Sequence, residues 1–165
     1  MGRVLLDNEK WDFGTNCYVC EPKNERGLGI PFYHDIDAAT IVAEFTPETH
    51  HSGAPAFAHG GLCMALLDEG MAWAIIAIEH RFGVTRKIDV SFERPVRIGQ
   101  PYTVSCRIES REGQDLVATG EIRDARERAC VTARGTFHAL TAAEAAQALG
   151  QPSEQAKSYT EPGRQ

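Results

Sequence analysis

The sequence has no excess of positive charge. Its 165 residues include 17 Lys and Arg against 23 Asp and Glu, which gives a formal net charge of −6. Proteins that bind nucleic acids draw much of their affinity from Lys and Arg side chains that neutralise phosphates. We therefore expect no nucleic-acid partner, and any basic patch on this protein must be local.

The sequence also lacks an apolar run long enough to span a bilayer. The longest run, Leu62 to Ile78, is shorter than the roughly 20 residues that a spanning helix needs, and Asp68 and Glu69 interrupt it. The N-terminus has no long apolar region of the kind found in a secretion signal, and the five cysteines fit reduced thiols better than a disulfide framework. We expect a buried helix, no membrane partner and a cytoplasmic location.

Alternating apolar and polar residues are plentiful, and they predict strands. The pattern is clearest over residues 39–45, and it returns in four later runs that cover residues 84–92, 102–108, 116–122 and 129–137. The turns between the later runs are short enough for antiparallel neighbours. The sequence thus predicts an α+β fold in which one long central helix is wrapped by a curved antiparallel sheet of five to six strands.

The length and a hydrophobic content of 42% fit one globular domain. We place this domain at residues 28–140. Residues 1–27 form an N-terminal segment with a Cys-x-x-Cys motif, and residues 141–165 hold a short helix and a polar tail. Thr141 predicts the start of that helix and Gly150 its end. The tail beyond Gly150 is expected to be disordered.

The strongest functional signal lies at the start of the long helix. His59-Gly60-Gly61 follows a predicted loop over residues 47–58, and Asp68 lies further along the apolar helix. Backbone N–H groups at a helix start bind anions, and a carboxylate inside an apolar helix is costly without a partner or a chemical role. Acyl transfer to water uses both features. The Gly60 and Gly61 amides would hold the developing oxyanion, and Asp68 would activate water or attack directly.

The spacing of these residues points to two chains. His59 and Asp68 are nine residues apart, which is about 13 Å along a helix axis. A reacting carbon must lie about 3 Å from both the attacking group and the stabilising donors. The short Asp68 side chain does not bridge that gap. If both ends of the helix serve one reaction, they come from different chains of a two-fold symmetric homodimer.

These residues resemble the helix signature of a known family. His59-Gly60-Gly61 followed by Asp68 is similar to the signature of hotdog-fold acyl-CoA thioesterases of the PaaI type, within the 4-hydroxybenzoyl-CoA thioesterase-like superfamily. The similarity runs from about Gly27 to Phe137. It implies a helix wrapped by an antiparallel sheet, assembly as dimers or dimers of dimers, and hydrolysis of an acyl-CoA substrate to a free acid and a thiol.

The resemblance also implies roles for four residues. Gly60 would donate the oxyanion N–H, His59 would support that loop, and Asp68 would be the catalytic carboxylate. Thr85 falls where related enzymes often place a Ser or Thr that helps to position the water or the acid. Whether the carboxylate acts as base or nucleophile stays open.

Five further residues are expected to contact the substrate. Gly61 lies beside the expected oxyanion donor, and Gly53 stands where some relatives carry an Asn or Gln. The locally basic segment that contains Arg86, Lys87 and Arg94 would hold the phosphates of coenzyme A. A solvated strand face is the alternative for these three side chains.

The Cys-x-x-Cys motif of Cys17 and Cys20 predicts no metal site, because zinc would need two further ligands. The other three cysteines lie inside helix or strand patterns, so we expect no metal and no cofactor. The segment resembles an N-terminal motif of a subset of hotdog proteins and would fold over the mouth of the acyl pocket. Glu69 points about 100° away from Asp68 on a helix, which makes it a structural partner.

Other interpretations stay open at this level. Asp68 could be a buried acid paired with an arginine, His59 could only cap the helix, and Thr85 could serve only its strand. The protein could also bind acyl-CoA without catalysis, as a sensor or carrier, because a fold does not decide function. Hydration or dehydration of acyl thioesters is a further class on this fold, but the sequence lacks its motifs. The preferred acyl group is not encoded in any motif.

Overall fold

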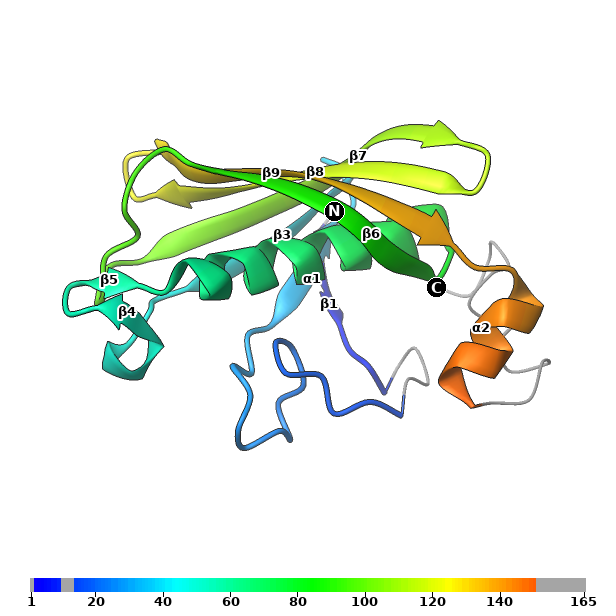
Figure 1. Cartoon of the computed structure of the whole chain (residues 1–165), viewed down its shortest axis with the longest axis horizontal. Helices are drawn as coiled ribbons and strands as arrows, with labels where there is room; N and C mark the ends of the chain where they lie inside the picture. Colours follow the sequence, from blue (N-terminus) through cyan, green and yellow to red (C-terminus); the bar gives the residue numbers. More distant parts are fainter. Residues whose placement is uncertain (1, 10–13, 151–165) are drawn as a thin grey trace.

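A computed structural model describes residues 2–9 and 14–150 of the chain. One long helix, α1 (Gly60–Glu79), packs on a seven-stranded sheet in which every neighbouring pair is antiparallel (Figure 1). In sheet order the strands are β1 (Arg3–Leu6), β2 (Phe32–Asp35), β3 (Thr40–Phe45), β7 (Tyr102–Glu112), β8 (Asp115–Asp124), β9 (Ala129–Ala139) and β6 (Gly83–Phe92). The structure confirms the expected α+β hotdog arrangement.

The expected number of five to six strands was too low by one edge strand. β1 lies in the N-terminal segment and pairs with β2, from Arg3 opposite Asp35 to Leu6 opposite Phe32. Three of its four residues are exposed, so the strand carries no alternation that sequence periodicity detects. The other edge of the sheet is β6, whose residues are mostly exposed. That edge matters for the site described below.

α1 is a core helix. At 20 residues it extends beyond the apolar run at both ends, and by length and composition alone it could cross a membrane. It packs against β3, β6, β7, β8 and β9, and its Leu66, Leu67, Met71 and Ile75 side chains are fully buried there. Burial of this stripe against the sheet supplies the apolar core of the protein.

Two glycines let the helix approach the sheet closely. A Cβ atom on Gly70 of α1 would lie 2.7 Å from Cys106 Sγ on β7, and one on Gly120 of β8 would lie 2.8 Å from the same sulfur. Both distances are shorter than atoms in contact allow. Larger residues at these positions would therefore push α1 away from the sheet.

The segment before α1 is more ordered than the predicted loop. It contains the short 3-10 helix η1 (Thr49–His51) and a two-stranded sheet of β4 (Ser52–Ala54) and β5 (Phe57–Ala58). The Ala58 amide donates to the Val96 carbonyl at 2.8 Å, and the Ile98 amide donates to the Ala56 carbonyl at 3.1 Å. These bonds hold the start of α1 against the connection between β6 and β7.

The C-terminal helix α2 (Ala142–Leu149) begins and ends where its sequence predicts. Thr141 is the N-cap, and its hydroxyl and the Glu144 carboxylate form the expected capping box. Gly150 ends the helix with a left-handed φ of 64°, a conformation that glycine adopts without a steric cost. The tail that we expect to be disordered, residues 151–165, lies outside the described residues.

The N-terminal segment covers the side of α1 that faces away from the sheet (Figure 1). Val19 and Cys20 are buried in the same core as the helix. The segment is joined to the chain before β2, because the Leu28 amide donates to the Tyr18 carbonyl at 2.7 Å and the Ile30 amide to the Val19 carbonyl at 2.9 Å. α1 is thus enclosed between the sheet on one side and residues 17–30 on the other.

Candidate active site

The start of α1 is shaped by His59. This residue is the N-cap, and its Nδ1 accepts a hydrogen bond from the Gly61 amide at 2.9 Å. Its own amide donates to the His51 carbonyl at 2.8 Å. A Cβ atom on Gly53 would lie 2.9 Å from His59 Cα, so Gly53 supports His59 by close packing. The Gly61 amide, which the sequence offers as an oxyanion donor together with Gly60, donates to His59 in this structure.

Gly60 lines a cavity of about 330 Å³ at this end of the helix. Phe57 and Cys63 form part of the wall, and Phe92 and Arg94 face them from the end of β6 and the connection that follows. Phe92 is 55% exposed although it is a large aromatic residue. The amide of Gly60, the first residue of the helix, is therefore the backbone donor that a ligand in this cavity would meet.

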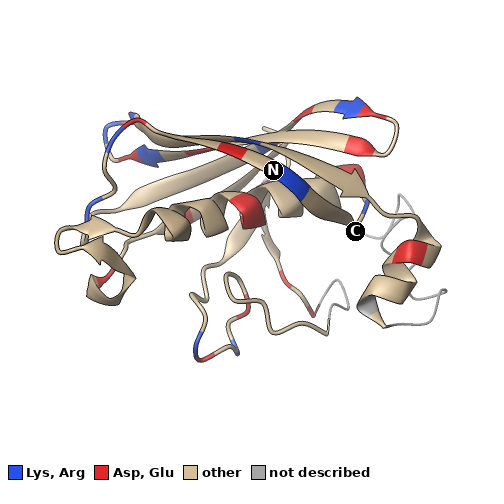
Figure 2. Cartoon of the chain, in the orientation of Figure 1, with Lys and Arg blue, Asp and Glu red and all other residues tan. Residues whose placement is uncertain are grey.

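Asp68 lies in the middle of α1, next to Glu69. This helix carries acidic residues but no Lys or Arg (Figure 2). Asp68 Oδ1 accepts a hydrogen bond of 2.8 Å from the Thr85 hydroxyl on β6. Burial raises the pKa of Asp68 above its ordinary value of 3.8, and the hydrogen bond from Thr85 opposes that shift. Within the described part of the chain no arginine pairs with Asp68. The structure thus brings together two of the four expected catalytic residues.

The other two expected catalytic residues, His59 and Gly60, lie at a different place on the helix. Gly60 and Asp68 are eight residues apart, which corresponds to about 12 Å along the axis. No bend in α1 shortens this separation, because Gly60–Glu79 forms one continuous helix. One chain therefore presents two half-sites, an amide end and a carboxylate.

The three expected phosphate-binding residues do not gather at one place. Arg86 lies 3.7 Å from the Asp115 carboxylate, and Lys87 lies 2.7 Å from the carboxylate of Asp89. Both side chains project from the exposed edge strand β6. Only Arg94, whose Nη1 donates to the Ala129 carbonyl at 2.6 Å, lies beside the Gly60 cavity.

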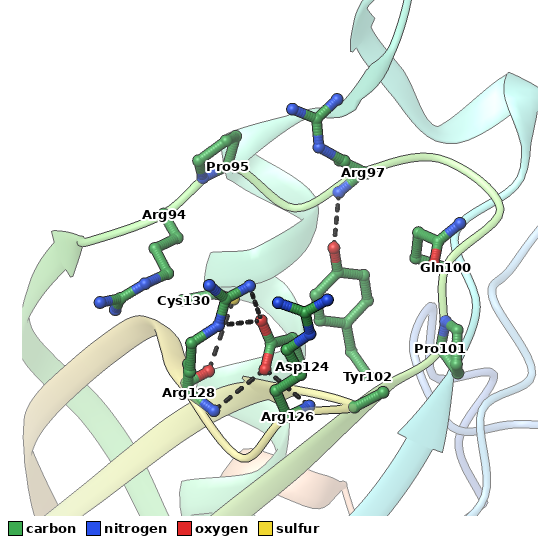
Figure 3. A pocket seen from close by; sticks show the side chains of 11 residues that line it. Arg94, Pro95, Arg97, Gln100, Pro101, Tyr102, Asp124, Arg126, Arg128 and Cys130 are labelled. Atoms are coloured by element: carbon green, nitrogen blue, oxygen red, sulfur yellow. Dashed lines mark hydrogen bonds and ion pairs between the residues drawn. The ribbon is translucent and has the colours of Figure 1, made fainter.

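A second cavity adjoins Arg94 and contains residues that sequence reasoning missed. It has a volume of about 560 Å³, and four arginines line it, namely Arg94, Arg97, Arg126 and Arg128 (Figure 3). Arg128 is paired with Asp124 at 2.9 Å, and the Arg97 guanidinium lies 5.2 Å from the centre of the Phe57 ring. In the sequence Arg126 and Arg128 stand in a charged turn, and no local signal connects that turn to Arg94.

Comparison with known proteins finds a matching family and curated relatives. Residues 56–131 match the model of the thioesterase superfamily. Mouse acyl-coenzyme A thioesterase THEM5 is 30% identical over 144 residues, which cover 86% of this chain and 56% of THEM5. Over residues 56–131 the chain is therefore similar to the thioesterase superfamily. Mouse acyl-coenzyme A thioesterase THEM4 is 25% identical over 111 residues, or 66% of this chain and 47% of THEM4, so the chain spans about half the length of these curated relatives.

Solved structures confirm the hotdog fold. RHA08564, a thioesterase superfamily protein, has a TM-score of 0.71 at 23% identity, over 84% of this chain and 68% of its own. Escherichia coli PaaI, from the phenylacetic acid degradation operon, has a TM-score of 0.59 at 21% identity, over 62% of this chain and 74% of its own. Streptococcus mutans smu.793, solved with bound acetyl CoA, has a TM-score of 0.58 at 14% identity, over 62% of this chain and 82% of its own.

The region that matches the superfamily holds most of the site. Residues 56–131 include Gly60, Asp68 and Thr85 and all four arginines of the second cavity. Cys17 and Cys20 lie outside that region. The matched region therefore carries both half-sites, whereas the Cys-x-x-Cys segment lies outside it.

Proposed function

We propose that this protein hydrolyses acyl-CoA thioesters to a free acid and coenzyme A. One observation carries the proposal: Asp68, fixed by Thr85, lies on the same helix whose first amide, Gly60, opens onto a cavity. The match to the superfamily model and the names of the mouse relatives support the same reaction class. The arrangement supplies an oxyanion donor and a carboxylate, which are the two groups that thioester hydrolysis needs.

In the proposed reaction the thioester carbonyl oxygen accepts a hydrogen bond from the Gly60 amide. As a base, Asp68 takes a proton from water while the water oxygen bonds to the carbonyl carbon, and the carbon–sulfur bond then breaks to release the thiol. As a nucleophile, Asp68 displaces the thiolate itself, and water hydrolyses the resulting anhydride. Thr85 holds the carboxylate in place in either case. Both routes give the same products, and the contact of Asp68 with Thr85 is compatible with either role of the carboxylate.

We further propose that the complete site forms between two chains. Gly60 and Asp68 of one chain are about 12 Å apart, too far to act on one carbonyl carbon. The edge strand β6 bears Thr85 and the exposed apolar residues Val84 and Phe92. A two-fold contact at this edge would pair exposed strands and bury these side chains, and it would create two equal sites in a homodimer. A dimer of dimers is compatible with the same contact.

For the phosphates of coenzyme A we propose the cavity lined by Arg94, Arg97 and Arg126. It adjoins the Gly60 cavity through Arg94, so a thioester at Gly60 would place its nucleotide end among cationic side chains. Guanidinium groups bind phosphate oxygens through charge-assisted hydrogen bonds. Arg86 and Lys87 are paired with Asp115 and Asp89 on the edge strand, so they suit this role less well.

The test is a panel of acyl-CoA substrates in an assay that captures the released thiol. The wild-type protein should release coenzyme A from at least one substrate. The Asp68→Asn variant should lower kcat by about 10²- to 10⁴-fold, since it keeps the shape of the side chain but removes the base or nucleophile. The matched control is Glu109→Gln, which removes a carboxylate that pairs with Arg134 on the sheet surface.

Three outcomes would contradict hydrolysis. One is the absence of thiol release with every substrate of the panel. Another is a rate of thiol release that Asp68→Asn and Glu109→Gln lower by the same factor. Tight binding of an acyl-CoA without turnover would instead support the alternative of a sensor or carrier.

A further inference from the structure

The side of α1 that faces away from the sheet carries a cluster of three side chains that the proposed hydrolysis does not use. Cys17 and Cys20 come from the N-terminal segment, and Glu69 comes from the middle of the helix. Their two sulfur atoms and a carboxylate oxygen all lie within 4.8 Å of one another. The sequence places Glu69 about fifty residues after the cysteines, and only the fold brings them together.

The spacing of these atoms fits the ligands of one tetrahedral ion. Zinc bonds of about 2.3 Å to sulfur and about 2.1 Å to oxygen place a sulfur and an oxygen ligand about 3.6 Å apart, and two sulfurs about 3.8 Å apart. Cys17 Sγ lies 3.5 Å from Glu69 Oε1. Small rotations of the side chains would close the set around a single ion.

Both sulfur atoms accept hydrogen bonds from N–H groups. The Val19 amide donates to Cys17 Sγ at 3.4 Å, and Asn8 Nδ2 donates to Cys20 Sγ at 3.4 Å. Asn8 is itself buried and held by the Glu21 carboxylate at 3.1 Å. Such donors around metal-bound sulfur fix the orientation of the ligands and stabilise their negative charge.

The loop that carries the cysteines is shaped to present them. Asn24 Nδ2 donates to the Asn16 carbonyl at 3.1 Å and to the Cys17 carbonyl at 3.4 Å, so its side chain closes the loop. A Cβ atom on Gly27 would lie 2.6 Å from the Tyr18 carbonyl oxygen, and only glycine allows this close return of the chain. The Cys-x-x-Cys turn is therefore built tightly onto α1.

The cluster also opens onto a cavity. A space of about 260 Å³ is lined by Cys17, Glu69, Asn8 and Thr15, with Ala72 on the helix beside them. A tetrahedral ion with three protein ligands keeps a fourth position for water, and this cavity provides room for it. Within the described residues Glu69 has no ion pair with an arginine or lysine, although it lies in an apolar helix. A bound cation would supply the missing positive charge.

We propose that Cys17, Cys20 and Glu69 bind one thiophilic divalent cation, with Zn²⁺ the best match to two sulfurs and a carboxylate. The ion would attach the N-terminal segment to the helix that carries Asp68. The proposal is independent of thioester hydrolysis, since its tests measure metal binding and not activity. It also replaces our expectation from the sequence that the chain has no metal site.

Metal content and affinity of the full chain test the proposal. Purified under reducing conditions, the wild-type protein should contain about one zinc ion per chain by elemental analysis. After chelation, added Co²⁺ should give the near-ultraviolet absorption of thiolate ligands, and Zn²⁺ should raise Tm again. Cys17→Ser, Cys20→Ser and Glu69→Gln should abolish stoichiometric binding. Asn8→Ala should weaken zinc binding by about 10- to 100-fold.

The matched control is Cys130→Ala, which removes a buried cysteine of β9 away from the cluster and should keep the full metal content. A second measurement needs no variant. In the wild-type protein, zinc should protect Cys17 and Cys20 from alkylation, and a chelator should remove that protection. Reduced protein that binds neither Zn²⁺ nor Co²⁺ would overturn the proposal. So would a Cys17–Cys20 disulfide found by mass spectrometry together with alkylation that zinc leaves unchanged.

Discussion

At the scale of single residues, Gly60 offers both a backbone N–H donor and the space left by a missing side chain. Two substitutions test these two properties separately. Gly60 is the first residue of α1, a position at which proline is well tolerated in helices. The preceding residue, His59, has φ −63° and ψ 133°, the extended conformation that a residue before proline adopts. A proline at position 60 would remove the N–H group and leave the helix start intact.

We predict that Gly60→Pro lowers kcat by about 10²- to 10³-fold, the usual cost of losing one oxyanion donor. Gly60→Ala keeps the N–H and adds a Cβ atom 3.3 Å from the Phe92 ring, a contact that a shift of a few tenths of an ångström relieves. Its kcat should stay within a few fold of the wild type. Steady-state kinetics on the best acyl-CoA substrate measure both values, and equal losses in the two variants would argue against the amide as a donor.

Thr85 is a positioning residue, since it touches Asp68 and not the expected place of the thioester. Removal of its 2.8 Å hydrogen bond in Thr85→Ala should lower kcat by about tenfold, the equivalent of about 1.4 kcal/mol. Thr85→Ser keeps the hydroxyl and should restore most of the rate. The comparison of kcat for the two variants is the measurement. If serine gave no rescue, the role of Thr85 would be packing on β6.

At the scale of elements, the turn between β8 and β9 depends on the ionised Asp124 carboxylate. Asp124 Oδ1 accepts the Arg126 and Arg128 amides at 2.9 and 3.0 Å, and Oδ2 accepts Arg128 Nε at 2.9 Å. These hydrogen bonds, that from the Arg128 side chain foremost, lower the pKa of Asp124 to about 2. Its contribution to stability is therefore complete above the unfolded pKa of about 3.9 and disappears as the pH falls toward 2.

We predict that Asp124→Asn destabilises the protein at neutral pH, and that the difference from the wild type narrows between about pH 4 and pH 2. Denaturant unfolding at a series of pH values measures the difference. If the difference in unfolding free energy between the two proteins stayed constant over this pH range, the charge of Asp124 would contribute nothing to the turn.

The contact of α1 with the sheet gives a second prediction at this scale. Gly70→Ala would gain about 1 kcal/mol of helix propensity, but its Cβ would lie 2.7 Å from Cys106 Sγ. Overpacking costs about 1 to 3 kcal/mol, so we expect a net loss of stability. The double variant with Cys106→Ala should recover part of that loss. Thermal or denaturant unfolding of the two single variants and the double variant measures the coupling, and strict additivity would contradict the contact.

Periodicity predicts the elements of this fold well because most of them have one buried face. The long helix, the five runs of alternation and the Thr141 cap of α2 are all predicted from their own residues. β1 is not, because three of its four residues are exposed and its order comes from pairing with β2. Chemistry, not periodicity, singles out the start of α1 and Asp68. Backbone N–H groups at a helix start bind anions, and a carboxylate in an apolar helix is costly.

The rest of the candidate site depends on contacts between distant parts of the chain. Arg97 and Arg126 meet at one cavity although they belong to different connections of the sheet. The sequence predicts no metal site at Cys17 and Cys20 because it offers no matching cysteines as further ligands. In the structure the third candidate ligand atom belongs to a carboxylate on α1. No local pattern reports such pairs, since they arise only when the sheet is assembled.

At the scale of the whole molecule, a site shared between two chains predicts complementation. Asp68→Asn and Gly60→Pro homodimers should both be nearly inactive. After unfolding and refolding together in equal amounts, about half of the dimers would be mixed, each with one intact site of two. The mixture should then regain about a quarter of the wild-type activity. Activity that stays at the level of the separate variants would contradict a shared site, and the same sample in analytical ultracentrifugation reports whether dimers form.

Asp68 and Glu69 are neighbours on one helix, yet they meet partners on different sides of it, Thr85 on β6 and Cys17 in the N-terminal segment. One inserted or deleted residue between Gly60 and Asp68 would rotate both carboxylates by about 100° and separate each from its partner. Related proteins should therefore differ in the side chains of α1 wherever the available volume allows it. The number of residues between Gly60 and Asp68 should stay constant. Insertions should be found instead in the hairpin connection 113–114, where an extra residue leaves both carboxylates in place.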